Sequence, residues 1–154
     1  MQVEEFLKQD NIQSLLYHED MDELFFEWAR TSNSNYRPLV KFFETNDINA
    51  LDYMSVIPNG YFYFNPTESI IIPEGIKEIA SNAIYRCRNL TEIHIPKSVK
   101  DIFKHAICGC EQLNKITYEG TAKEFKQIAD DNFCTEAVSI ICTDETIEYE
   151  YWDE

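Results

Sequence analysis

Glycine and basic residues are scarce in this chain, and no long apolar run is present. Only 4 of 154 residues are glycine, so a glycine-rich loop that cradles a phosphate is not expected. Acidic residues number 28 against 13 lysines and arginines, for a net charge of −15. Nucleic acids and anionic membranes are bound by clustered lysine and arginine, so we expect neither as a direct partner. A basic protein is the natural complement, although such charge also simply keeps small proteins soluble.

The cysteines indicate a reducing compartment. There are five, an odd number, and the first residues (MQVEE) are acidic where a secretory signal needs a basic start and an apolar run. We therefore expect reduced thiols and a cytoplasmic protein. His105, Cys108 and Cys110, with Cys87, could suggest a metal site, but they supply only one tight cysteine pair. We expect no metal or cofactor: Cys87 and Cys110 should be buried, and Cys108 should face outward as the most reactive thiol.

No catalytic constellation is recognisable. His18, His94 and His105 are far apart in the sequence, and none lies near a nucleophile motif. We expect a protein that is not an enzyme, with no catalytic residues.

Residues 70 to 115 contain one unit twice, with a period of 23 residues. The run IIIP at 70–73 returns as IHIP at 93–96, and nine of the 23 aligned positions are identical. A third copy begins at 116–118 and then diverges. Fixed periods of this size indicate a solenoid, in which each unit buries its apolar face against the next. Solenoids present surfaces for binding rather than catalytic clefts.

Each unit is expected to contain three parts. A short strand (70–72 and 93–95) ends at proline, and a bend or second short strand follows through residues 76–79 and 99–102. A helical turn should come next, because the apolar positions then recur at offsets of 0, 1, 4 and 7, on one helix face. These positions are Ala83, Ile84, Cys87 and Leu90, and in the next unit Ala106, Ile107, Cys110 and Leu113.

The repeated pattern I-x-I-P-x-x-(I/V)-x-x-I-x-x-x-A-I-x-x-C-x-x-L resembles the BspA-type leucine-rich repeat over about residues 66–143. The segment from Tyr118 to Phe125 (YEGTAKEF) also resembles the closing segment common in that family. The chain departs by having Ala-Ile where the family usually has Ala-Phe, and Ala80 and Phe103 where it usually has glycine. Members implied by the resemblance are often long secreted adhesins without catalytic residues. This chain is short, lacks a signal and is helical at its start, so the adhesin role is not expected.

Helices are predicted ahead of the repeats. Short apolar clusters fit two helices within residues 3–16, and Pro38 suits the first turn of another. The clearest helix begins near Asp20, with apolar residues at i, i+3, i+4 and i+7. These are Met21, Leu24, Phe25 and Trp28. A turn at 58–60 and a strand-like aromatic run at 61–64 then lead into the repeats.

Two acidic rows are candidate binding sites. Glu19, Glu23 and Glu27 recur every four residues on the Asp20 helix, with Asp22 and Phe26 on the same side. Residues 147–154 (IEYEYWDE) alternate apolar and acidic side chains as a strand does. Either row could occupy a basic groove built for phosphates, or be an ordinary solvated surface.

The fold class predicted is α+β, with a helical subdomain (1–57), a short leucine-rich-repeat solenoid (58–143) and an acidic C-terminal strand or tail (144–154). The function predicted is non-enzymatic protein binding, as an acidic inhibitor that blocks the basic site of a nucleic-acid-handling partner such as a bacterial defence nuclease. Its partner-binding residues would be Glu19, Asp22, Glu23, Phe26, Glu27, Glu148, Glu150, Asp153 and Glu154. The alternative is a generic interaction or oligomerisation module that binds through a repeat face of Ile71, His94 and Thr117. The partner, the oligomeric state and a phage or cellular origin stay open.

Overall fold

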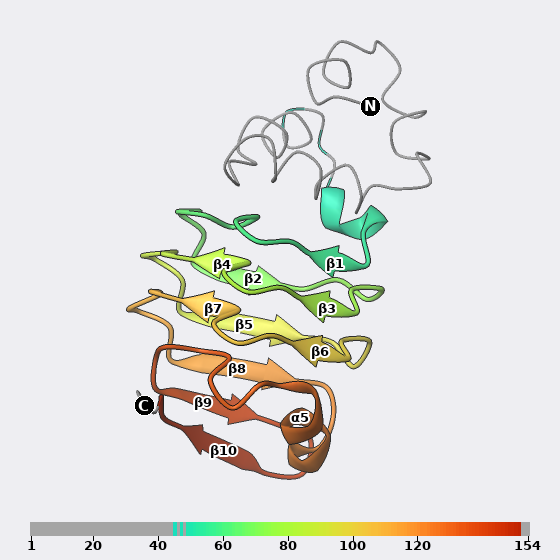
Figure 1. Ribbon diagram of the computed structural model, residues 1–154, viewed down its shortest axis with the longest axis vertical. Helices are drawn as coiled ribbons and strands as arrows, with labels where there is room; N and C mark the ends of the chain where they lie inside the picture. The colour runs from blue at the N-terminus through green and yellow to red at the C-terminus, as the bar shows by residue number, and fades with distance from the viewer. Residues whose placement is uncertain (1–44, 46, 48, 152–154) are drawn as a thin grey trace.

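The chain winds into coils that stack along one axis, and successive coils add short strands to three sheets (Figure 1). The computed structural model describes residues 45, 47 and 49–151. The helices predicted between residues 3 and 43, with their acidic row, lie outside the described residues, as do residues 152–154. Among the described residues, no helix has the length and apolar character needed to cross a bilayer.

The largest sheet has five strands in the order β10-β9-β8-β5-β2. The first four along the chain pair in parallel, and β10 turns back antiparallel to β9. Ile70 pairs with Ile93, and Ile93 with Ile116, so the predicted period of 23 residues is confirmed by the strand register. The strands are β2 (Ser69–Ile71), β5 (Glu92–Ile95), β8 (Lys115–Tyr118), β9 (Val138–Ile141) and β10 (Thr146–Tyr149).

Two smaller parallel sheets form the other sides of the stack (Figure 1). One contains β1 (Val56–Ile57), β3 (Glu78–Ile79) and β6 (Asp101–Ile102). The other contains β4 (Ile84–Tyr85) and β7 (Ile107–Cys108). A 3-10 helix, Ala50–Tyr53, precedes β1. The observed solenoid therefore includes the last residues of the predicted helical subdomain (1–57). Strand β10, from the predicted C-terminal segment (144–154), belongs to the five-stranded sheet of the solenoid.

The predicted helical turn in each repeat is wrong, because β4 and β7 stand in its place. Asn82 and Arg86 flank β4 with left-handed φ angles of 57° and 53°, which an α-helix excludes. The backbone N–H of Ile84 donates to the carbonyl of Ala106 in the next coil at 3.0 Å. The corners of the coil, not a helical period, therefore turn the apolar side chains inward. The four apolar positions of each unit are nevertheless buried, as predicted.

The aromatic run 61–64 forms consecutive turns, so its prediction as a strand is also wrong. Phe64 has a left-handed φ of 55°, which is incompatible with the extended backbone of a strand. Two N–H groups of the run still donate to the coil below, from Phe62 to the Ala83 carbonyl at 2.9 Å and from Phe64 to the Tyr85 carbonyl at 3.0 Å. The run therefore extends the side of the solenoid that contains β4 and β7.

The core is a set of columns of apolar side chains from equivalent positions. Ile93 and Ile116, adjacent in one column, are 1% and 0% exposed. Among the described residues, every fully buried side chain is apolar or a cysteine. Burying each isoleucine contributes about 1.5–3 kcal/mol, so regular stacking is the main source of stability.

The C-terminal end of the stack is closed by helix α5 (Ala122–Ile128) and a chain of aromatic rings. Thr121 caps the helix, since its hydroxyl accepts from the N–H of Glu124 at 3.1 Å. Tyr118, Phe125, Phe133 and Tyr149 follow one another with ring centroids 5.3, 5.4 and 4.8 Å apart. The third copy, which the sequence predicted to diverge after residue 118, thus continues into helix α5 and the aromatic rings that close the stack.

Candidate protein-binding surface

The outward face of the largest sheet presents two straight rows of side chains, one residue from each strand. The rows follow from the register, because paired residues on neighbouring strands point to the same face. The first row contains Ile71, His94, Thr117, Ile141 and Thr146. The second contains Ser69, Glu92, Lys115, Ser139 and Glu148. The predicted repeat face, Ile71, His94 and Thr117, is therefore a contiguous part of a longer row.

Apolar side chains are left in solvent near both ends of the first row. Ile71 is 73% exposed and Ile141 is 38% exposed. A depression of about 360 Å³ lies at the β2 end, with Ser69, Ile71 and His94 in its wall. Removing an exposed isoleucine side chain from water stabilises a complex, so this row can supply apolar anchoring contacts to a partner.

The charges in the middle of the face are paired. His94 Nε2 lies 2.8 Å from Glu119 Oε1, and this hydrogen bond lowers the pKa of the Glu119 carboxyl. Lys115 Nζ lies 3.3 Å from Glu92 Oε2. Both pairs are substantially exposed, so they contribute little to stability.

The acidic prediction and the repeat-face prediction meet on this surface. Glu148, from the predicted acidic row, ends the second row, where Ser139 Oγ donates to its Oε2 at 2.7 Å. Glu150 follows β10 and is exposed. The other predicted partner-binding residues, Glu19, Asp22, Glu23, Phe26, Glu27, Asp153 and Glu154, lie outside the described residues. The structure thus places Glu148, one residue of the predicted acidic site, on the same sheet face as the predicted repeat face.

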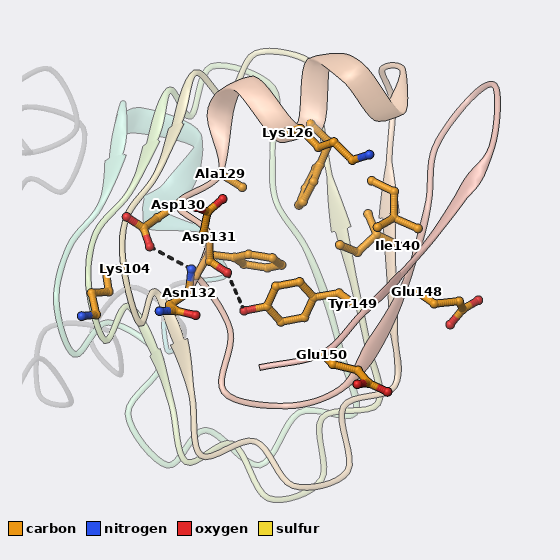
Figure 2. A pocket seen from close by; sticks show the side chains of 13 residues that line it. Lys104, Lys126, Ala129, Asp130, Asp131, Asn132, Ile140, Glu148, Tyr149 and Glu150 are labelled. Carbon is orange, nitrogen blue, oxygen red and sulfur yellow. Dashed lines mark hydrogen bonds between the residues drawn. The ribbon is translucent and has the colours of Figure 1, made fainter. Parts of the chain in front are cut away.

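A hollow of about 710 Å³ lies at the C-terminal end of the stack (Figure 2). Its floor contains the nearly buried rings of Phe125 and Phe133. The Tyr149 hydroxyl donates to the carbonyls of Asp131 at 3.0 Å and Cys134 at 2.9 Å, which holds its ring across the hollow. The charged residues that line it are Lys104, Lys126, Asp130, Asp131, Glu148 and Glu150.

Sequence reasoning missed the contribution of Asp130 and Asp131 to this acidic end. A signal was present, since the two adjacent acids lie in the most acidic third of the chain. Their proximity to β10 depends on the antiparallel return of that strand, which brings Tyr149 against the carbonyl of Asp131. Figure 2 shows the carboxylates of Glu148 and Glu150 pointing away from the Tyr149 ring.

The cysteines lie where the repeat alignment predicted them. Cys87 and Cys110 are fully buried, and the hydrogen bond between their thiols, together with burial, raises the pKa of Cys110. Cys108 pairs in register with Tyr85 and is partly exposed. His105 contacts the hydroxyl of Tyr151 at 3.3 Å. In the described part of the chain, no group of three or more His, Cys, Asp or Glu side chains could hold a metal ion.

Comparison with known families is consistent with this geometry. The family model described as "BspA type Leucine rich repeat region (6 copies)" matches residues 41–151, a longer segment than the sequence pattern indicated. No curated protein and no solved structure matches the chain. Repeats of this type typically serve as non-enzymatic interaction modules for other proteins. The chain belongs to the BspA-type leucine-rich repeat family.

Proposed function

We propose that this chain is a protein-binding module that docks a basic partner protein on the outward face of its largest sheet. The observation that carries the proposal is the placement of Ile71 and Glu148 on one continuous face. The row from Ile71 to Ile141 supplies apolar contacts. Glu148, with Glu150 beside it, favours a partner of opposite charge.

Charge and apolar contact have different effects in such an interface. Exposed acids on a chain of net charge −15 accelerate encounter with a basic surface, and salt weakens that attraction. Apolar anchors slow dissociation and depend little on salt. In the more specific form of the proposal, the partner handles nucleic acid and the bound chain blocks its phosphate-binding groove, as in an inhibitor of a defence nuclease.

The docking face is tested by capturing partners from a cell lysate on immobilised full-length chain and identifying them by mass spectrometry. We expect Ile71→Asp to reduce the captured partner about tenfold or more, since it places a charge against an apolar contact. Glu148→Lys with Glu150→Lys should reduce capture most at about 0.1 M salt, where the Debye length is about 10 Å. Lys77→Gln with Lys100→Gln is the control, because both lysines are exposed and flank strands of a different sheet. Equal capture by all variants would contradict docking on this face.

The inhibitor form is tested with the captured partner in purified form. The chain should displace a labelled DNA or RNA oligomer from that partner, and Glu148→Lys with Glu150→Lys should not. A partner that binds the chain and the nucleic acid at the same time would refute inhibition and leave the docking proposal intact.

A further inference from the structure

Two arginines lie over aromatic rings at the side of the solenoid that contains β4. We call this surface the arginine–aromatic edge, and its members are Tyr63, Phe64, Tyr85, Arg86 and Arg88. The rings of Tyr63 and Tyr85 stack with centroids 5.4 Å apart and planes 10° from parallel. The Arg86 guanidinium lies 5.2 Å from the Tyr85 centroid and 6.0 Å from that of Phe64. Arg88 lies 5.7 Å from the same Phe64 ring.

These arginines are exposed, and no ion pair joins either of them to an acid among the residues that the structure describes. Within the described part of the chain, the ion pairs join His94 to Glu119, Lys97 to Glu124 and Lys115 to Glu92. Neither Arg86 nor Arg88 has a carboxylate of residues 49–151 within 4 Å. A guanidinium that lies over an aromatic ring still has N–H groups that can bind a carboxylate by two parallel hydrogen bonds.

Two bulky residues at this edge have left-handed backbone angles, a conformation that glycine would adopt without strain. Phe64, Arg86 and Gly109 occupy the same corner of successive coils, with φ angles of 55°, 53° and 71°. Only glycine adopts such angles without a steric penalty. A Cβ at Gly109 would lie 3.1 Å from Cγ of Arg86, so the glycine leaves room for the arginine side chain. Bulky residues kept in this conformation are typical of functional positions.

We propose that the arginine–aromatic edge binds an acidic segment of a partner protein, with carboxylates seated on Arg86 and Arg88. Both guanidinium groups lie within 6.0 Å of the centroid of the same Phe64 ring, so one short extended segment with alternating acidic side chains can reach both. Because the rings already restrain the arginines, less side-chain entropy is lost on binding. The net charge of −15 opposes a long polyanion such as RNA, which favours a short acidic peptide. The site is separate from the proposed docking face, which lies on another sheet.

The test uses the full-length chain and two fluorescent peptides, acetyl-(Ser-Glu)4-amide and acetyl-(Ser-Gln)4-amide, with binding followed by anisotropy. We expect only the glutamate peptide to bind, and Arg86→Gln with Arg88→Gln to weaken it about tenfold or more. Arg86→Lys with Arg88→Lys should give partial loss, because lysine retains charge but not bidentate geometry. Lys77→Gln with Lys100→Gln removes the same charge from another side and should leave binding unchanged.

Arg86→Gly separates binding from folding. This variant relieves the left-handed backbone, so its melting temperature should equal or exceed that of the parent while peptide binding weakens. Equal binding of both peptides, or full binding by the double Gln variant, would overturn the proposal. A uridine decamer that binds through these arginines more tightly than the glutamate peptide would overturn the assignment to an acidic protein segment.

Discussion

At the corner before β4 and β7, the backbone is left-handed in three successive coils. Gly60, Asn82 and His105 have φ angles of 81°, 57° and 56°. They are joined in a ladder, since the N–H of Gly60 donates to the Asn82 carbonyl at 2.9 Å and that of Asn82 to the His105 carbonyl at 2.8 Å. Asparagine and histidine are enriched at such angles among non-glycine residues. A solenoid with repeated left-handed corners can therefore be built from a chain with few glycines.

We expect Asn82→Ala to lower the free energy of unfolding by about 1 kcal/mol, because alanine tolerates the left-handed region poorly. Asn82→Gly should stay close to the parent, since relief of strain is offset by greater freedom of the unfolded chain. Urea unfolding of both variants measures the difference, with Gln112→Ala as a control at an exposed turn position without positive φ. Equal stabilities for the Ala and Gly variants would show that this corner carries no strain.

At the scale of the element, each strand is too short to be stable alone. β3, β4, β6 and β7 have two residues each, so their hydrogen bonds and apolar contacts come from neighbouring coils. Leu90 and Leu113 occupy the same position of successive repeats and are 0% and 3% exposed. The stack therefore transmits the loss of one core side chain to the adjacent coil.

Leu90→Ala or Leu113→Ala should each lower the free energy of unfolding by about 2–5 kcal/mol, because a cavity remains where the side chain was. Ile71→Ala is the control, since Ile71 is an apolar residue that is 73% exposed, and we expect a change below about 1 kcal/mol. Denaturant unfolding monitored by circular dichroism measures all three. Wild-type stability of both leucine variants would mean that the two positions do not share a core column.

Helix α5 was not predicted, although its first residues belong to the segment that resembles the family's closing segment. The sequence Thr121-x-x-Glu124 is a helix-start pattern, and the structure uses it, with Thr121 as the cap. The opposite error occurred at β4 and β7, where apolar spacing suited a helix. Spacing alone cannot distinguish a helix face from a chain that turns at two left-handed corners and keeps the same residues inward.

At the scale of the whole molecule, the closed C-terminal end makes stability dependent on pH. Burial raises the pKa of Tyr149 to about 12 and that of Cys134 to about 12. In the unfolded chain these groups titrate near 10 and 8.5. Since both are held neutral in the folded state, their contribution is fully present below about pH 8.5 and is lost as the pH rises toward 12.

We therefore expect the free energy of unfolding to fall progressively between about pH 9 and pH 12. Tyr149→Phe should lower stability at pH 7 by about 1 kcal/mol, because two carbonyls lose their donor. The same variant should show a shallower decline above pH 10, where it has no phenol to ionise. Urea titrations at several pH values provide the test, and parallel declines of variant and parent would contradict the role of Tyr149.

The sequence by itself determined the repeat, its period, the residues that face the core and the acidity of the described C-terminal strand. These features are local or periodic, and apolar residues at fixed intervals must be buried wherever the coils stack. Only the tertiary structure decided that Glu148 shares a face with Ile71 and His94, because that depends on the antiparallel return of β10. It also decided that Arg86 and Arg88 lie over the ring of Phe64, which belongs to the preceding coil. Contacts between coils depend on strand register and corner geometry, and neither is contained in the order of residues along a single repeat.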